Sequence, residues 1–232
     1  MKIAIRGEGP TDIGVLNTDG SLEKGPMLIL IEKLDCYQNL YNELWCTEEY
    51  NSIQWVYIHK KEIEQSPIKR KRVVLRGKKA QRDKSVDTAL LRGFYNNSES
   101  FASLAKDRES DLAIFFVDSD KDSMEDRYKQ VKLGLAEYGF DKTGVPMIPK
   151  SISESWLLCC LNSYQNCKKL EALTNDKSNP DYPKTLIRKS GKFHQEIAES
   201  CDSNRIDMPS FNRFREDFKV AINNYMNNKI CK

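Results

Sequence analysis

Two short acidic stretches have the residue types and spacing for metal-assisted chemistry. Glu8 and Asp12 lie in the turn "GEGPTD", and Asp118 and Asp120 form a D-x-D. Clustered carboxylates repel one another unless a cation neutralises them, and an all-oxygen ligand set favours Mg²⁺ or Mn²⁺ over zinc. Two such ions about 4 Å apart can activate a water and stabilise the leaving oxygen of a phosphodiester. The residues therefore indicate two-metal phosphodiester hydrolysis.

Apolar segments that are typical of β-strands precede both acidic stretches. Residues 1–5 precede the first, and residues 112–117, six consecutive apolar residues, precede the second. A continuous run of this length favours a strand buried on both faces. We expect further strands at 52–59 and at 143–150, the latter at a sheet edge because prolines interrupt it. Apolar residues at helical spacing predict helices at 26–44, 79–106, 123–138 and from 151 onward.

This alternation predicts an α/β fold with a parallel four-stranded sheet and right-handed crossovers. The carboxyl ends of its strands would face one crevice, where the four acids could meet. In the tail, residues 173–184 read as a polar loop, 190–201 as a mixed segment and 210–226 as a final helix. We interpret an apolar stripe on that helix as core packing: Phe211, Phe214, Phe218, Ile222 and Tyr225.

Composition bounds the class of protein. The chain has 232 residues, 39% of them hydrophobic, which is typical of a soluble globular protein with one sizeable core. Its apolar runs are too short for a membrane span or a signal peptide, so we expect no membrane association and a cytoplasmic location. The seven cysteines include no C-x-x-C pair and there are two histidines, which argues against structural zinc and for reduced, mostly buried thiols.

A basic segment forms part of an insertion at about 60–84. Residues 69–84 contain nine basic side chains and one acid, whereas the net charge of the whole chain is only +3. Such a run can be a solvated face or a mobile loop, or it can bind the phosphate backbone of a nucleic acid. The candidate phosphate contacts are Lys69, Arg70, Lys71, Arg72, Arg76, Lys78, Lys79 and Arg82.

Other interpretations of the acidic stretches are weaker or remain open. The first turn lacks the lysine of a phosphate-binding loop and the glycine spacing of a dinucleotide site. A calcium-binding loop after Asp118 is excluded because Ser123 and Lys129 occupy its glycine and glutamate positions. Asp118 and Asp120 could be turn residues, or Asp118 could be the nucleophile of a phosphatase.

Three motifs in order resemble those of the Toprim domain of topoisomerases, primases and nucleases. Over residues 1–165 the pattern is similar to the OLD-like nucleases and their stand-alone RloB-like relatives: E-x-x-x-D, D-x-D, and S-x-x-E at Ser151 and Glu154 followed by "SWLL". The resemblance implies a Toprim-like, Rossmann-like catalytic domain at 1–165 and a helical C-terminal extension at 166–232. It implies that five carboxylates bind two Mg²⁺ or Mn²⁺ ions and that Ser151 supports the site. The five are Glu8, Asp12, Asp118, Asp120 and Glu154.

The same resemblance implies a catalytic lysine after the S-x-x-E helix. Lys184 and Lys192 both qualify, and either could be an ordinary surface lysine. Glu154 could instead be a carboxylate that stabilises a helix N-terminus.

The function that the resemblance implies is an endonuclease acting on DNA or RNA, transfer RNA included, as the effector of a bacterial antiviral defence system. The chain has no room for the extra domains of topoisomerases and primases. It has no ATPase motif, so an ATPase would be a separate chain, and a homodimer could form through the helical tail. The alternatives are a non-catalytic regulatory subunit that binds such an ATPase, and the phosphatase.

Overall fold

A parallel sheet of four strands forms the centre of the protein. The computed structural model describes residues 1–7, 9–16, 22–46, 53–65, 88–119 and 123–230. The strands are β1 (Lys2–Arg6), β4 (Gln54–Tyr57), β5 (Leu112–Phe116) and β6 (Gly144–Met147), in the order β4-β1-β5-β6. All three strand pairs are parallel, which confirms the α/β prediction, and β6 lies at an edge as expected.

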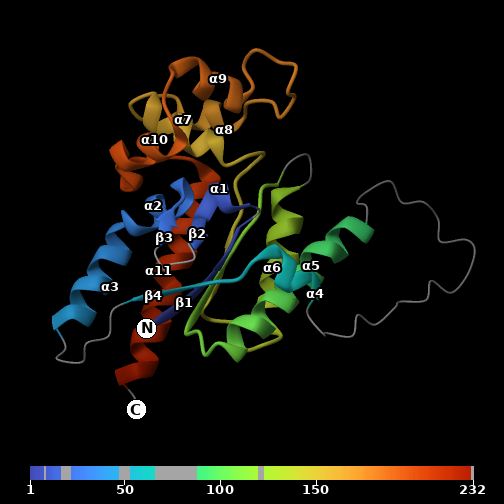
Figure 1. Ribbon diagram of the computed structural model, residues 1–232, viewed down its shortest axis with the longest axis vertical. Coiled ribbons are helices and arrows are strands. Elements are labelled where there is room, and N and C mark those ends of the chain that lie inside the picture. Colours follow the sequence, from blue (N-terminus) through green and yellow to red (C-terminus); the bar gives the residue numbers. More distant parts are fainter. Residues whose placement is uncertain (8, 17–21, 47–52, 66–87, 120–122, 231–232) are drawn as a thin grey trace, which may run out of the picture.

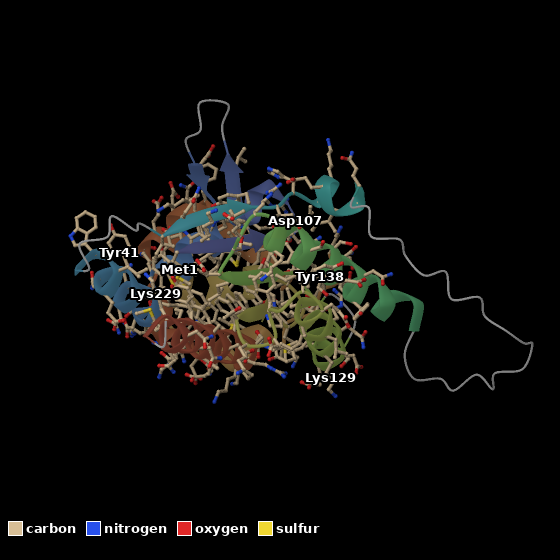
Figure 2. All side chains as sticks on the ribbon, turned by 90° about the horizontal axis from the view of Figure 1, so that it is seen from below. Met1, Tyr41, Asp107, Lys129, Tyr138 and Lys229 are labelled. Atoms are coloured by element: carbon tan, nitrogen blue, oxygen red, sulfur yellow. A yellow bond between two sulfur atoms is a disulfide. The ribbon has the colours of Figure 1, made fainter. Side chains whose placement is uncertain are left out.

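Helices cover both faces of this sheet. One face packs against α2 (Pro26–Glu32), α3 (Asp35–Cys46) and α11 (Pro209–Ile230), and the other against α5 (Thr88–Asp107) and α6 (Met124–Ala136). In Figure 2, the helix α3 with Tyr41 lies to the left of the strands, and the green helices α5 and α6 lie to their right. Every residue of β5 is buried, because a central strand covered on both faces exposes neither of its two sets of side chains.

The smaller elements gather at the carboxyl ends of the strands. Figure 1 shows the helices that follow β6 above the end of the sheet where β1 and β5 finish. They are α7 (Glu154–Leu161), α8 (Cys167–Glu171), α9 (Pro183–Ser190), α10 (His194–Ser200) and the 3-10 helix η1 (Ser203–Arg205). Nearer the N-terminus are α1 (Pro10–Ile13), the hairpin strands β2 (Gly14–Leu16) and β3 (Leu22–Lys24), and α4 (Lys60–Gln65).

Several local predictions were wrong. The predicted strands do not include β2 and β3, which pair with each other in an antiparallel hairpin. The single helix expected at 26–44 is two helices, α2 and α3. The expected loop and mixed segment of the tail contain the start of α9 and all of α10. Elements this short have almost no periodicity of their own and depend on tertiary packing for stability.

Four cysteines form two disulfides. Cys159 pairs with Cys167, and Cys160 pairs with Cys201. The prediction of reduced thiols is therefore wrong for these four residues. The physical reason is that α7 packs against both α8 and α10, so one of its two adjacent cysteines meets Cys167 of α8 and the other meets Cys201, which directly follows α10.

Cys36 is a free thiol, and we expect it to be slow to alkylate. Its burial raises its pKa from 9.0 to about 11, so at pH 8 the reactive thiolate should be roughly a hundredfold scarcer than for an unperturbed cysteine. The alkylation rate should then keep rising between pH 9 and pH 11. Peptide-level mass spectrometry of iodoacetamide labelling in buffer and in urea measures this. Equal rates in the two solvents at pH 8 would contradict the prediction.

The C-terminal helix supplies much of the core, as its apolar stripe predicted. Phe211, Phe214, Phe218 and Ile222 are buried, and Tyr225 is half-buried. The four buried residues belong to the same hydrophobic cluster as Ile3 and Ile114 of the sheet. Within the described residues, the structure contains no helix with the length and apolar character needed to cross a bilayer.

We expect Phe218→Ala to lower the free energy of unfolding by about 3–5 kcal/mol, because it removes a fully buried ring and leaves a cavity. Val220 lies on the same helix and is 54% exposed, so Val220→Ala should change that free energy by less than about 0.5 kcal/mol. Urea denaturation of the two variants measures the difference. Similar losses in both would show that α11 does not carry the core.

Candidate functional site

The candidate site lies where the sheet order reverses. From β1 the chain passes to β4 on one side of β1 and then returns to β5 on its other side. In open α/β sheets, the crevice at such a switch point, outside the carboxyl ends of the strands, is where ligands bind. Asp12 follows β1 and Asp118 follows β5, so both lie at this end of two neighbouring strands.

Asp118 is buried and fastened to the segment before α7. Only 8% of this residue is exposed, and its Oδ1 accepts a hydrogen bond of 3.0 Å from the main-chain N–H of Ser153. The Oγ of the next residue, Ser119, accepts a hydrogen bond of 2.7 Å from the N–H of Ser151. The guanidinium of Arg127 donates to the carbonyl oxygen of Asp118. These bonds hold Asp118 and Ser119 against the S-x-x-E segment.

Ser151 contacts the segment after β5 through its main-chain N–H. Its φ of 70° is left-handed, a conformation that non-glycine residues adopt only when surrounding contacts hold them there. The N–H bond to Ser119 is one such contact. The supporting role of Ser151 in a metal site stays a prediction.

Glu154 begins α7 and is 6% exposed. Its Oε1 lies 3.2 Å from Nζ of Lys184, which belongs to α9. Its Oε2 is buried and has no hydrogen-bond partner among the described residues. A buried carboxylate with one unsatisfied oxygen is costly, and a bound cation is one way to satisfy it.

Asp12 shares the electrostatic environment of Glu154. Burial and repulsion from the Glu154 carboxylate raise the pKa of Asp12, against the opposing effects of Gly9, Lys184 and His194. The Gly9 N–H donates to Oδ2 of Asp12 at 3.1 Å. Burial alone would lower the pKa of Lys184, but attraction to Glu154 outweighs it and raises that pKa.

The structure thus brings together Asp12, Asp118, Glu154 and Lys184 from four parts of the chain. The structure also distinguishes the two candidate lysines. Lys184 pairs with Glu154, whereas Lys192 is exposed in the loop after α9. Glu8 and Asp120 lie outside the described residues. So does the whole basic segment with its eight candidate phosphate contacts, whose role stays a prediction.

Sequence reasoning missed three residues near this site. His194, at the start of α10, is close enough to influence the charge of Asp12. Arg6 and Arg127 are buried, and each donates to a main-chain carbonyl at or just after the end of β5. Arg6 donates to the carbonyl of Phe116 at 3.3 Å, and Arg127 donates to that of Asp118. The sequence did offer a signal for Arg6, because a charged residue ends an otherwise apolar predicted strand.

The donor set fits a divalent cation in part. Among the described residues, no group of three or more histidine, cysteine, aspartate or glutamate side chains is arranged to hold a metal ion. Three of the five expected carboxylates are described, and they supply oxygen donors only. The unsatisfied Oε2 of Glu154 and the raised pKa of Asp12 are both what a hard, oxygen-binding cation would relieve.

Comparison of the chain with protein-family models, curated proteins and solved structures gave no significant match. The fold and the site by themselves define the class of this protein. It is an α/β protein with a doubly wound parallel sheet and buried carboxylates at the switch point. The resemblance to a Toprim domain rests on the sequence motifs.

Proposed function

We propose that this chain is a metal-dependent endonuclease with a Toprim-like fold that hydrolyses phosphodiester bonds of DNA or RNA, transfer RNA included. The observation that carries the proposal is the convergence of Asp12, Asp118 and Glu154 around one switch point, with an unsatisfied Glu154 oxygen and a lysine beside it. Two-metal phosphodiester hydrolysis uses such a combination, because acids hold the cations while a cationic side chain meets the anionic substrate.

The acidic side chains would hold the metal ions. Asp12, Asp118 and Glu154, together with Glu8 and Asp120, would bind two Mg²⁺ or Mn²⁺ ions. When bound, such ions supply Lewis-acid activation of a water and stabilise charge on the leaving oxygen. Burial of Asp118 and Glu154 keeps the carboxylates poorly hydrated, so they bind a cation more strongly than exposed acids would.

Lys184 would position the substrate. The Lys184 side chain is 52% exposed, and its Nζ forms an ion pair with Glu154. The lysine can therefore contact a phosphate oxygen from the solvent side without losing its partner. Arg127 and the N–H of Ser153 keep the Asp118 loop in place while the substrate binds.

The experiment that tests this function is cleavage of plasmid DNA and of total transfer RNA by the purified chain. We expect cutting in Mg²⁺ or Mn²⁺ and none in EDTA. The assay is repeated with any ATPase chain that co-purifies, because the resemblance also leads us to propose such a partner and a role in antiviral defence. Absence of cutting in every arm would contradict the nuclease and favour the non-catalytic subunit.

A further inference from the structure

A cavity lies beside the turn that follows β1. Its volume is about 590 Å³, within the range of small-ligand sites. Three segments line it: the end of β1 with its turn, the junction of α1 and β2, and the end of β4 with α4. The lining residues used below are Ile5, Gly7, Gly9, Ile13, Gly14, Tyr57, His59, Lys60, Lys61 and Glu64.

The interior of this cavity is apolar and partly aromatic. Ile5 and Ile13 are buried in the core cluster, and Tyr57 packs against that cluster from β4. The phenol oxygen of Tyr57 is buried and has no hydrogen-bond partner among the described residues. Because this oxygen is enclosed, the part of Tyr57 that lines the cavity is its ring.

The rim of the cavity is cationic. Among the lining residues, Lys60 and Lys61 stand against a single acid, Glu64. Lys60 and Glu64 approach to 4.0 Å, but both side chains are more than half exposed, and such a pair contributes little. The rim therefore keeps a positive charge available to an anion.

Glycines allow the main chain to pass closely between the cavity and the residues that follow β1. A Cβ on Gly7 would lie 2.5 Å from side-chain atoms of Ile13, and Gly14 has a φ of +121° that other residues rarely adopt. The Gly9 N–H, on the same turn, donates to the Asp12 carboxylate. One turn thus shapes the cavity and holds a candidate metal ligand.

We propose that this cavity binds one nucleotide unit of the substrate strand, with its base beside Tyr57 and its phosphate at Lys60 and Lys61. A base presents a planar, largely apolar face with polar edges, and the adjoining phosphate is an anion, which matches the apolar interior and the cationic rim. Aromatic side chains bind bases of any sequence by stacking. The inference rests on the proposed function, because the nucleotide would adjoin the bond that is cut.

The test is binding of short fluorescent single-stranded DNA and RNA in EDTA, where cleavage is silent, at several salt concentrations. Lys60→Ala/Lys61→Ala should weaken binding about tenfold and reduce the slope of log K against log salt by about 1. Tyr57→Leu should weaken binding about tenfold without changing that slope. The matched control is Lys168→Ala/Lys169→Ala on α8, which removes two adjacent lysines, one of them in a similarly exposed ion pair. It should bind within about twofold of the unaltered chain.

Circular dichroism verifies that each variant is folded. Equal losses in the pocket and control variants, or no loss in the pocket variants, would overturn the pocket. If the unaltered chain cuts nucleic acid while the pocket variants bind and cut normally, the pocket fails and the nuclease stands. If the unaltered chain neither binds nor cuts, both fail. A free 5′-mononucleotide that binds where the oligonucleotides do not would assign the cavity to a free nucleotide and overturn the substrate-strand proposal.

Discussion

Replacing Glu154 with glutamine is expected to abolish metal-dependent cleavage, lowering the rate at least about a hundredfold, which corresponds to a loss of about 3 kcal/mol of transition-state stabilisation. The substitution keeps the shape of the side chain but removes its charge. The metal-free protein should stay folded, because the repulsion between Glu154 and Asp12 is relieved. The measurements are the initial rate of cleavage and the urea midpoint of the same preparation.

The matched control for this variant is Glu109→Gln. Glu109 follows α5 at the opposite end of the sheet, and its side chain is 85% exposed beside Lys2. This variant should cut at the normal rate. Full activity of Glu154→Gln would remove Glu154 from the site and favour the phosphatase with Asp118 as nucleophile, which gives Glu154 no role.

Replacing Lys184 with methionine should slow cleavage and also destabilise the metal-free protein. The change leaves the buried Glu154 without its cationic partner. Loss of a partner from a fully buried pair costs several kcal/mol, but Lys184 is half exposed, so we expect about 1 kcal/mol. Cleavage should fall about tenfold to a hundredfold because the phosphate loses a positive contact. Mg²⁺ should stabilise this variant more than the unaltered chain, since a cation replaces the missing charge.

The controls follow from the pairing. Lys192→Met should change neither rate nor stability, because Lys192 lies exposed outside the pair. The double variant Glu154→Gln/Lys184→Met should be more stable without metal than Lys184→Met alone, because no unpaired charge remains. Urea denaturation with and without Mg²⁺ measures both effects. If Lys192→Met and Lys184→Met lose the same activity, Lys184 is not the lysine that serves the site.

The sequence determined the sheet and the placement of its acids. β1 and β5 are apolar runs that end in charged residues, and burial on both faces of a parallel strand requires such runs. Since parallel strands share one carboxyl end, the positions of Asp12 and Asp118 along the chain sufficed to predict that they would lie at the same edge. The stripe on α11 was equally readable, because helical spacing directly reports which face is buried.

Only the tertiary structure decided how the tail completes the site. Lys184 and Lys192 lie in similar sequence surroundings, and the packing of α9 against α7 selects Lys184 as the partner of Glu154. The pairing of Cys160 with Cys201 likewise joins residues that no local pattern connects. Periodicity records whether a side chain is buried, but not which distant side chain it meets. That choice depends on the free energy of all the packed helices together, which no short stretch of sequence contains.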